Sequence, residues 1–157
     1  MTRPPNLGID GSLRAIAIAA ERAQATPEIQ KIAQGVTTNA TERAEKMRLI
    51  VDELHRRYTY AADHISEAVG PVPLLEGSTM DVDDACLFVA ALAMSLGIRC
   101  RIVAARYERC WTCFVDYEAE DGGWVTIDPL RQRTQRAPEQ WIVGLEPDDD
   151  GHLRGNG

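Results

Sequence analysis

The stretch Asp81-Val-Asp-Asp-Ala-Cys-Leu-Phe-Val-Ala-Ala-Leu-Ala-Met-Ser-Leu-Gly-Ile98 decides the fold of this chain. Nearly every residue from Ala85 to Leu96 is apolar, which is typical of a helix buried in the middle of a domain. Carboxylates open the stretch, where they cap free backbone amides and favour the positive end of a helix. These carboxylates are Asp81, Asp83 and Asp84. Gly97 is suited to end the helix, since glycine readily adopts the left-handed conformation found there.

Helical patterns lead up to this stretch. After Ser12, apolar residues recur at helical spacing from Leu13 to Ala20, which makes Ser12 the expected N-cap of a first helix. Thr26-Pro27-Glu28 indicates a second helix, because it combines a capping hydroxyl, an N-terminal proline and an acid. Asn39 and Glu42 form a capping-box pattern, which predicts the start of a third helix.

Strand patterns follow the buried helix. Residues alternate in character from Ile98 to Ala105 and from Trp111 to Glu118, and Trp124 to Asp128 adds a third expected strand. Asp121-Gly-Gly123 predicts a hairpin turn between the last two strands. Residues 61–80, rich in glycine and proline, are expected to form a long loop or a crossover.

These patterns predict an α+β fold. Its N-terminal half is helical, and its central buried helix packs on a small antiparallel sheet. A chain of 157 residues is long enough for one domain with a substantial core. We expect residues 1–10 to be an N-terminal tail, residues 11–145 to form the domain, and residues 146–157 to be an acidic, flexible tail.

Charge narrows the classes of partner. The chain has 17 Lys and Arg against 24 Asp and Glu, a net charge of −7. Nucleic acids and anionic membranes are disfavoured, because both attract clustered cations. No apolar run approaches the ~20 residues of a membrane span, and the N-terminus has no apolar signal core. We expect synthesis in the cytoplasm and protein partners, and the oligomeric state stays open.

Several spaced features of the sequence together resemble one known protein family. They are the helix that closes in Leu96-Gly97-Ile98, the antiparallel meander that ends in Trp-x-x-x-Asp-Pro at 124–129, and the upstream segment Tyr58-Thr-Tyr60. This combination resembles the transglutaminase-like superfamily, which has a papain-like cysteine-hydrolase fold. The helical lead-in, the Tyr58-Thr-Tyr60 segment and the Pro-rich loop look like the versions found among tailed-phage and prophage structural genes. The resemblance covers roughly residues 10–130 and implies no cofactor.

The resemblance places three catalytic positions. In that family the helix opens with Gly-Asp-Cys-Asp-Asp, and the cysteine is the nucleophile. The matching segment here is Met80 to Asp84, which puts Val82 at the nucleophile position. The family's histidine opens the middle strand in a pattern like His-x-Trp-Val-Glu-Val, and Thr112 takes that position here. The acid before the proline at the end of the last strand is kept as Asp128.

The residues at these three positions imply that the fold is kept and the catalytic activity is lost. Such enzymes need a thiolate stabilised by the helix dipole and an imidazolium, with an acid that orients the imidazole. Valine offers no nucleophile and threonine offers no base at neutral pH, so we expect no catalytic residue. The expected function is that of a catalytically inactive domain with a structural or assembly role among the virion proteins of a tailed-phage or prophage particle.

Two alternatives stay open. A cysteine-dependent hydrolase or acyltransferase with a displaced nucleophile would use Cys86 or Cys110, with a remote histidine such as His64. A peptide- or small-molecule-binding module would use the vestigial cleft beside Val82. Cys86 lies one turn after Val82, where the helix dipole has mostly decayed, which favours a buried core thiol.

The remaining cysteine, acidic and histidine side chains are expected to have structural roles. The odd spacing of Cys110 and Cys113 on a strand directs their side chains to opposite faces, and their pairing in a disulfide stays open. The four cysteines lack the paired spacings of a zinc site, and the acids after Met80 lack the pattern of a calcium loop. We therefore predict no metal site. His55 is expected on an exposed helix end, where a cation favours the dipole.

Overall fold

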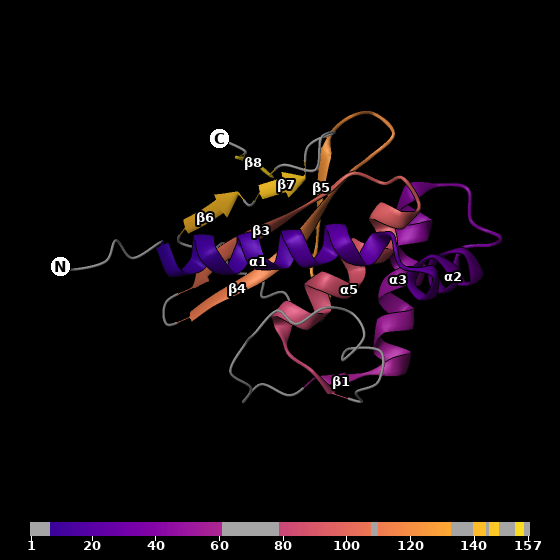
Figure 1. Ribbon diagram of the computed structural model, residues 1–157, viewed down its shortest axis with the longest axis horizontal. Coiled ribbons are helices and arrows are strands. Elements are labelled where there is room, and N and C mark those ends of the chain that lie inside the picture. Colours follow the sequence, from indigo (N-terminus) through magenta and orange to yellow (C-terminus); the bar gives the residue numbers. More distant parts are fainter. Residues whose placement is uncertain are drawn as a thin grey trace.

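The computed structural model describes residues 7–60, 79–107, 110–132, 140–143, 145–147 and 153–155. The helices are α1 (Leu7–Gln24), α2 (Pro27–Val36), α3 (Arg43–Arg57) and α5 (Val82–Ser95). The strands are β1 (Thr59–Tyr60), β2 (Thr79–Met80), β3 (Cys100–Tyr107), β4 (Cys110–Glu118), β5 (Trp124–Ile127), β6 (Gln140–Val143), β7 (Leu145–Pro147) and β8 (Leu153–Gly155). Figure 1 shows the α+β arrangement that the sequence predicts, with the helices gathered beside one antiparallel sheet.

Helix α5 is the centre of the core, as its sequence predicts. Asp81 is its N-cap and forms a capping box with Asp84, in which the Asp84 backbone N–H donates to Asp81 Oδ1 at 2.8 Å. All side chains from Ala85 to Ala93 are buried. The helix packs on α1, α2 and α3 and on strands β3 and β4 (Figure 1). Gly97 ends it with a φ of 79°, the left-handed conformation that favours glycine.

The main sheet has four antiparallel strands in the order β5-β4-β3-β6. The three expected strands are present, and β6 is an additional strand that the pattern analysis missed. The face of the sheet toward α5 carries Cys113 and Val115, which belong to the main core. Phe114 and Val103 belong to a second, smaller cluster. Because side chains alternate along a strand, this second cluster lies on the opposite face of the sheet.

The β4–β5 hairpin turns as the sequence predicts. Gly122 has a φ of 87°, and the Gly123 backbone N–H donates to Asp121 Oδ1 at 2.8 Å. The hairpin also reaches the helical layer, because the Arg43 backbone N–H donates to Glu120 Oε1 at 2.8 Å. The Arg43 guanidinium donates to the Glu118 carbonyl at the same distance. Contacts between residues far apart in sequence thus fix the start of α3 against the sheet.

Two helix starts differ from the sequence prediction. Helix α3 begins after Glu42, not after Asn39, and no side chain caps it from the N-cap position. The expected capping box is wrong because a carboxylate from the hairpin supplies the partner for the first turn. Helix α1 begins at Leu7, so Ser12 lies inside it. Gly8 and Gly11, which are poor helix formers, obscured this earlier start in the sequence.

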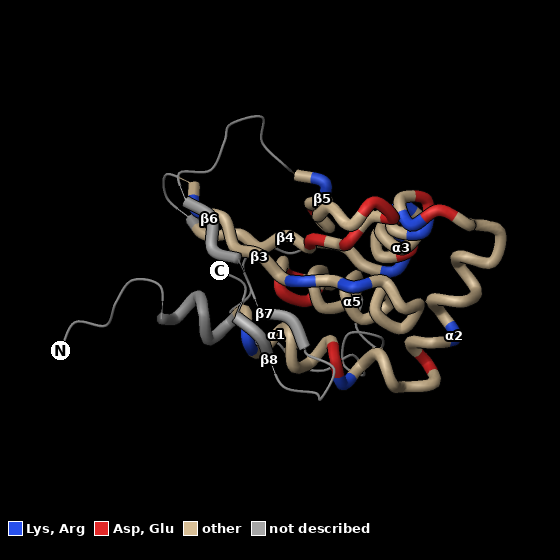
Figure 2. The backbone as a smooth tube through the Cα atoms, turned by 90° about the horizontal axis from the view of Figure 1, so that it is seen from above, with Lys and Arg blue, Asp and Glu red and all other residues tan. Residues whose placement is uncertain are grey.

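Charged side chains cover the outer faces of the helices. Figure 2 shows acidic and basic positions interspersed along α3. Arg48 lies on this face and pairs with Glu45 at 2.6 Å and with Asp52 at 2.8 Å. Pairs of this spacing join neighbouring turns, and each contributes only a few tenths of a kcal/mol. The inner stripe of α3, with Met47, Ile50 and Leu54 fully buried, therefore supplies most of its stability.

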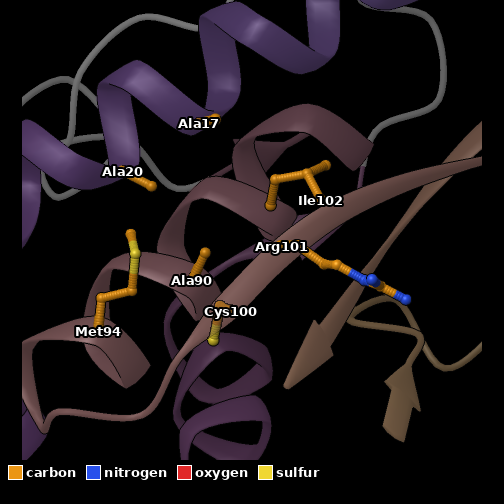
Figure 3. A pocket seen from close by; sticks show the side chains of 7 residues that line it. All are labelled: Ala17, Ala20, Ala90, Met94, Cys100, Arg101 and Ile102. Carbon is orange, nitrogen blue, oxygen red and sulfur yellow. The ribbon is translucent and has the colours of Figure 1, made fainter. Parts of the chain in front are cut away.

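Small residues let α1 approach α5 and β3 closely. Ala17, Ala20 and Ala90 face one another there, beside Met94 and Cys100 (Figure 3). The cavity that they leave measures about 10 Å³. A void of that size is at the lower limit for one water molecule, so this contact is packed core and holds no ligand.

The shorter strands lie outside the main sheet. β1 pairs with β2 in parallel, so Thr79–Met80 is a strand where the sequence predicts loop, and residues 61–78 lie outside the described residues. β7 and β8 pair in antiparallel orientation near α1. They fall in and beside the segment expected to be a flexible tail. Within the described residues, no helix combines the length and apolarity needed to cross a bilayer.

Candidate functional site

The position that the family resemblance assigns to the nucleophile is the first residue of α5. Val82 directly follows the N-cap Asp81 and is half-buried, with its side chain packed against the main core. A helix N-terminus presents free backbone N–H groups and a positive partial charge, which would stabilise a thiolate there. An isopropyl side chain makes no use of either feature. The capping box pairs the backbone N–H groups of Asp81 and Asp84 with each other's carboxylates.

The contact between α5 and the middle strand involves the chain neighbours of the predicted site residues. The Cys113 thiol donates to Asp83 Oδ1 at 3.7 Å, and both residues are buried. Thr112 is half-buried and shares a face of β4 with Phe114, because neighbouring side chains on a strand point in opposite directions. The structure therefore brings Cys113, and not Thr112, against the first turn of α5. Sequence reasoning placed Cys113 and Cys110 on opposite faces of the strand but did not identify this contact.

The two thiols nearest this contact are poor nucleophiles. Cys86 is fully buried, and burial raises its pKa well above the ordinary value. The nearby Cys113 and the Asp83 carboxylate raise the pKa of Cys86 further. Burial and the same carboxylate also raise the pKa of Cys113 strongly. Only the thiolate reacts, so these surroundings oppose the activation that a displaced nucleophile would need.

The retained acid, Asp128, is engaged by its own turn. Its Oδ1 accepts from the Leu130 backbone N–H at 3.0 Å, and its Oδ2 accepts from the Gln132 backbone N–H at 2.7 Å. Both carboxylate oxygens of Asp128 thus bind backbone amides just after the end of β5. Between these two amides Arg131 adopts a φ of 57°, and its guanidinium pairs with Asp52 of α3. Asp128 thus shapes the turn that docks β5 on α3.

His55 contributes to the same docking and corrects the sequence prediction. It was expected on an exposed helix end, but it is half-buried, and its Nε2 lies 2.6 Å from the Pro129 carbonyl oxygen. A hydrogen bond of this length requires that Nε2 carry the proton and donate. The flanking Arg56 and Arg57 made this end of α3 resemble a solvated one, and only the tertiary contact shows the role of the histidine.

The acids at the start of α5 crowd one another. Burial raises the pKa of Asp84 to about 6, and the neighbouring Asp81 and Asp83 carboxylates contribute to this rise. Because the folded pKa is above the ordinary 3.8, the folded state binds this proton more tightly than the unfolded chain does. The resulting stabilisation is complete below pH ~4 and is lost as the pH rises through 6.

Asp84→Asn should remove this pH dependence. Asparagine retains an oxygen that accepts from the Asp81 backbone N–H but carries no charge. We expect a free energy of unfolding about 1–2 kcal/mol higher than that of the wild type at pH 8, with the two values converging near pH 4. Urea unfolding at both pH values measures this, with Asp121→Asn in the exposed hairpin as the matched control. A lower stability of Asp84→Asn at pH 8 would contradict the prediction.

The other sequence candidates stand apart. The side chain of Cys110 and the whole of His64 lie outside what the structure describes. Cys86 and Cys113 are free thiols, so Cys113 is in no disulfide. Among the described residues, no group of three or more histidine, cysteine, aspartate or glutamate side chains is arranged to hold a metal ion.

Solved structures share this architecture at low sequence identity. A putative protease from Parabacteroides distasonis has a TM-score of 0.60 at 13% identity, over 92% of this chain and 30% of its own. A putative cysteine protease from Cytophaga hutchinsonii has a TM-score of 0.57 at 17% identity, over 82% and 45%. The periplasmic domain of TgpA from Pseudomonas aeruginosa, bound to ethylmercury, has a TM-score of 0.55 at 15% identity, over 73% and 49%. The chain thus spans between 30% and 49% of the length of each of these proteins.

Sequence comparison assigns the family. No curated protein sequence matches the chain significantly. The family model of the transglutaminase-like superfamily matches residues 30–129, which is well over half of the 157 residues. This match runs from α2 through the buried helix and the meander to the proline after Asp128. The chain therefore belongs to the transglutaminase-like superfamily.

Proposed function

We propose that this domain is a non-catalytic transglutaminase-like domain with a structural or assembly role, in a tailed-phage or prophage particle. The observation that carries the proposal is Val82 at the first position of α5, where the family places its cysteine. A fold can persist when the chemistry of its site is lost, because the buried helix and the sheet serve stability independently. The particle as the place of assembly follows from the sequence resemblance alone.

The surroundings of Val82 support the same proposal. A displaced nucleophile would need a lowered thiol pKa and access to substrate, whereas Cys86 and Cys113 are buried and their pKa values are raised. Asp128 holds backbone amides with both of its oxygens, which leaves it poorly placed to orient a histidine. The alternative of a binding module that uses the cleft beside Val82 has little support, because Val82 packs against the core.

Thiol alkylation tests the absence of catalysis. The wild type and a Cys110→Ser variant are compared, because Cys110 is itself a candidate nucleophile, whereas Cys86, Cys100 and Cys113 are all buried. We expect iodoacetamide to label both native proteins slowly at pH 7 and all of their thiols rapidly in urea, because the buried thiols react only when the core opens and Cys110 is not activated. Mass spectrometry of the intact protein measures the labelling. One thiol that reacts rapidly in the folded protein would contradict the proposal and favour a displaced nucleophile.

The assembly role needs a separate measurement. We expect the protein to be found in particles purified on a density gradient from the native host, in a fixed ratio to the other virion proteins. Quantitative mass spectrometry of the gradient fractions measures that ratio. Recovery of the protein only in the soluble fractions would show that the particle assignment is wrong.

A further inference from the structure

A groove lies between α2 and the C-terminal end of α3, away from the residues of the vestigial site. Figure 1 shows these two helices beside each other. The groove is open to solvent, and its volume of about 490 Å³ is within the range of about 300–1,000 Å³ that ligand sites occupy. Its lining residues are Glu28, Lys31, Ile32, Gly35, Val36 and Arg57. Nothing in the proposed function so far uses this surface.

The floor of the groove is apolar and open. Ile32 and Val36 are half-buried and lie one turn apart on α2. Gly35 lies between them in sequence, has no positive φ, and a Cβ added to it would meet no atom within 4 Å. A glycine inside a helix is about 0.5–1 kcal/mol less favourable than alanine, and neither backbone conformation nor crowding requires it here. Its effect is to leave the floor of the groove uncovered.

The rim of the groove carries a surplus of positive charge. Glu53 is buried and accepts from Arg56 Nε at 2.8 Å and from Arg57 Nε at 3.1 Å, so one carboxylate serves two guanidinium groups. Among the charged residues that line the groove itself, Lys31 and Arg57 are cations and Glu28 is the one carboxylate. Figure 2 marks the acidic and basic positions of α2. Cations therefore outnumber carboxylates here, whereas the whole chain has a net charge of −7.

We propose that the groove binds an acidic peptide segment of a protein partner, one in which leucine-like side chains alternate with carboxylates. The apolar side chains would cover Ile32 and Val36 at the open position of Gly35, and the carboxylates would pair with Lys31 and Arg57. Charge complementarity selects this occupant, since a basic segment would meet the surplus cations. The inference rests on the proposed function and names the chemistry of the partner of an assembly domain.

Fluorescence anisotropy with a labelled peptide of alternating leucine and glutamate tests the proposal on the full chain. We expect saturable binding, and no binding of the matched leucine–lysine peptide. Gly35→Trp, which fills the groove, and Lys31→Glu should each weaken binding by about fivefold or more. Gly35→Ala should bind as the wild type does. Arg14→Glu on the exposed face of α1 should also leave binding unchanged, because it reverses a charge away from the groove.

Each result of the peptide-binding experiment either supports or overturns the proposal. Failure of the leucine–glutamate peptide to bind overturns the proposal, as does equal binding of the lysine peptide. Binding that Gly35→Trp leaves unchanged, in a variant whose thermal unfolding remains cooperative, also overturns it. The thiol measurement does not depend on the groove. A result of slow alkylation without peptide binding would therefore reject this inference and leave the proposed function in place.

Discussion

Phe88→Ala is expected to lower the free energy of unfolding by about 3–5 kcal/mol, which is a large part of the stability of a single domain. Phe88 is fully buried in the middle of α5, where three helices and the sheet meet. Its ring meets that of Tyr58 edge-on, with centroids 5.7 Å apart and planes at 75°. Alanine removes the apolar contact area, leaves a cavity and ends the aromatic contact.

Urea unfolding followed by circular dichroism measures this loss. Phe88→Leu keeps most of the volume and should cost about 1 kcal/mol. Val125→Ala, at a side chain that is 39% exposed on edge strand β5, should change stability by less than about 0.5 kcal/mol. If Phe88→Ala were no more harmful than Val125→Ala, the placement of α5 at the centre of the core would be wrong.

Tyr58→Phe separates the ring contact from the hydroxyl. Within the described part of the chain, the buried Tyr58 hydroxyl has no hydrogen-bond partner, and burial raises the pKa of Tyr58. Phenylalanine keeps the edge-on contact with Phe88 and removes a hydroxyl group that burial has shielded from water. We expect stability to be unchanged or to rise by about 1 kcal/mol. A loss of more than about 1 kcal/mol would show that the hydroxyl has a partner in solution.

The parts of the fold that the sequence predicted are those with local signals. Asp81 and Gly97 mark the two ends of α5 because a capping box and a left-handed glycine are formed within a few residues of chain. The hairpin at Asp121 is equally local. The apolar character of α5 then predicts its central place, because a helix without a polar face must be covered on all sides.

The parts that the sequence did not predict depend on contacts between distant segments. The start of α3 is set by Glu120, which is 77 residues from Arg43. The docking of His55 is set by Pro129, 74 residues away. Strand β6 is a short apolar run that only pairing with β3 defines. Alternation separates the two faces of β4, but the packing of α5 alone shows that Cys113 is on the helix-facing side and that Asp83 is its partner.

One polar network crosses the main sheet and stands out by its burial. Arg101, Asp116 and Thr126 lie opposite one another on β3, β4 and β5. Arg101 Nε donates to Asp116 Oδ2 at 2.9 Å, and Thr126 Oγ1 donates to Asp116 Oδ1 at 2.6 Å. The Arg101 guanidinium also lies 4.2 Å from the centroid of the Trp124 ring. Asp116 is only 4% exposed, so these partners take the place of water around its carboxylate.

Arg101→Met should therefore destabilise the protein by about 3–5 kcal/mol, because it leaves the buried Asp116 carboxylate without its cation. The matched control is Arg99→Met, which removes a guanidinium that also lies over Trp124 but pairs with the partly exposed Glu118. That change should cost no more than about 1 kcal/mol.

The double variant Arg101→Met/Asp116→Asn should regain much of the loss, since it removes the unpaired charge and keeps an acceptor for Thr126. Urea unfolding of the three variants at pH 7 decides the matter. Equal losses for Arg101→Met and Arg99→Met would show that Asp116 is solvated, and that the strand order β5-β4-β3 is held by its backbone pairing and apolar faces alone.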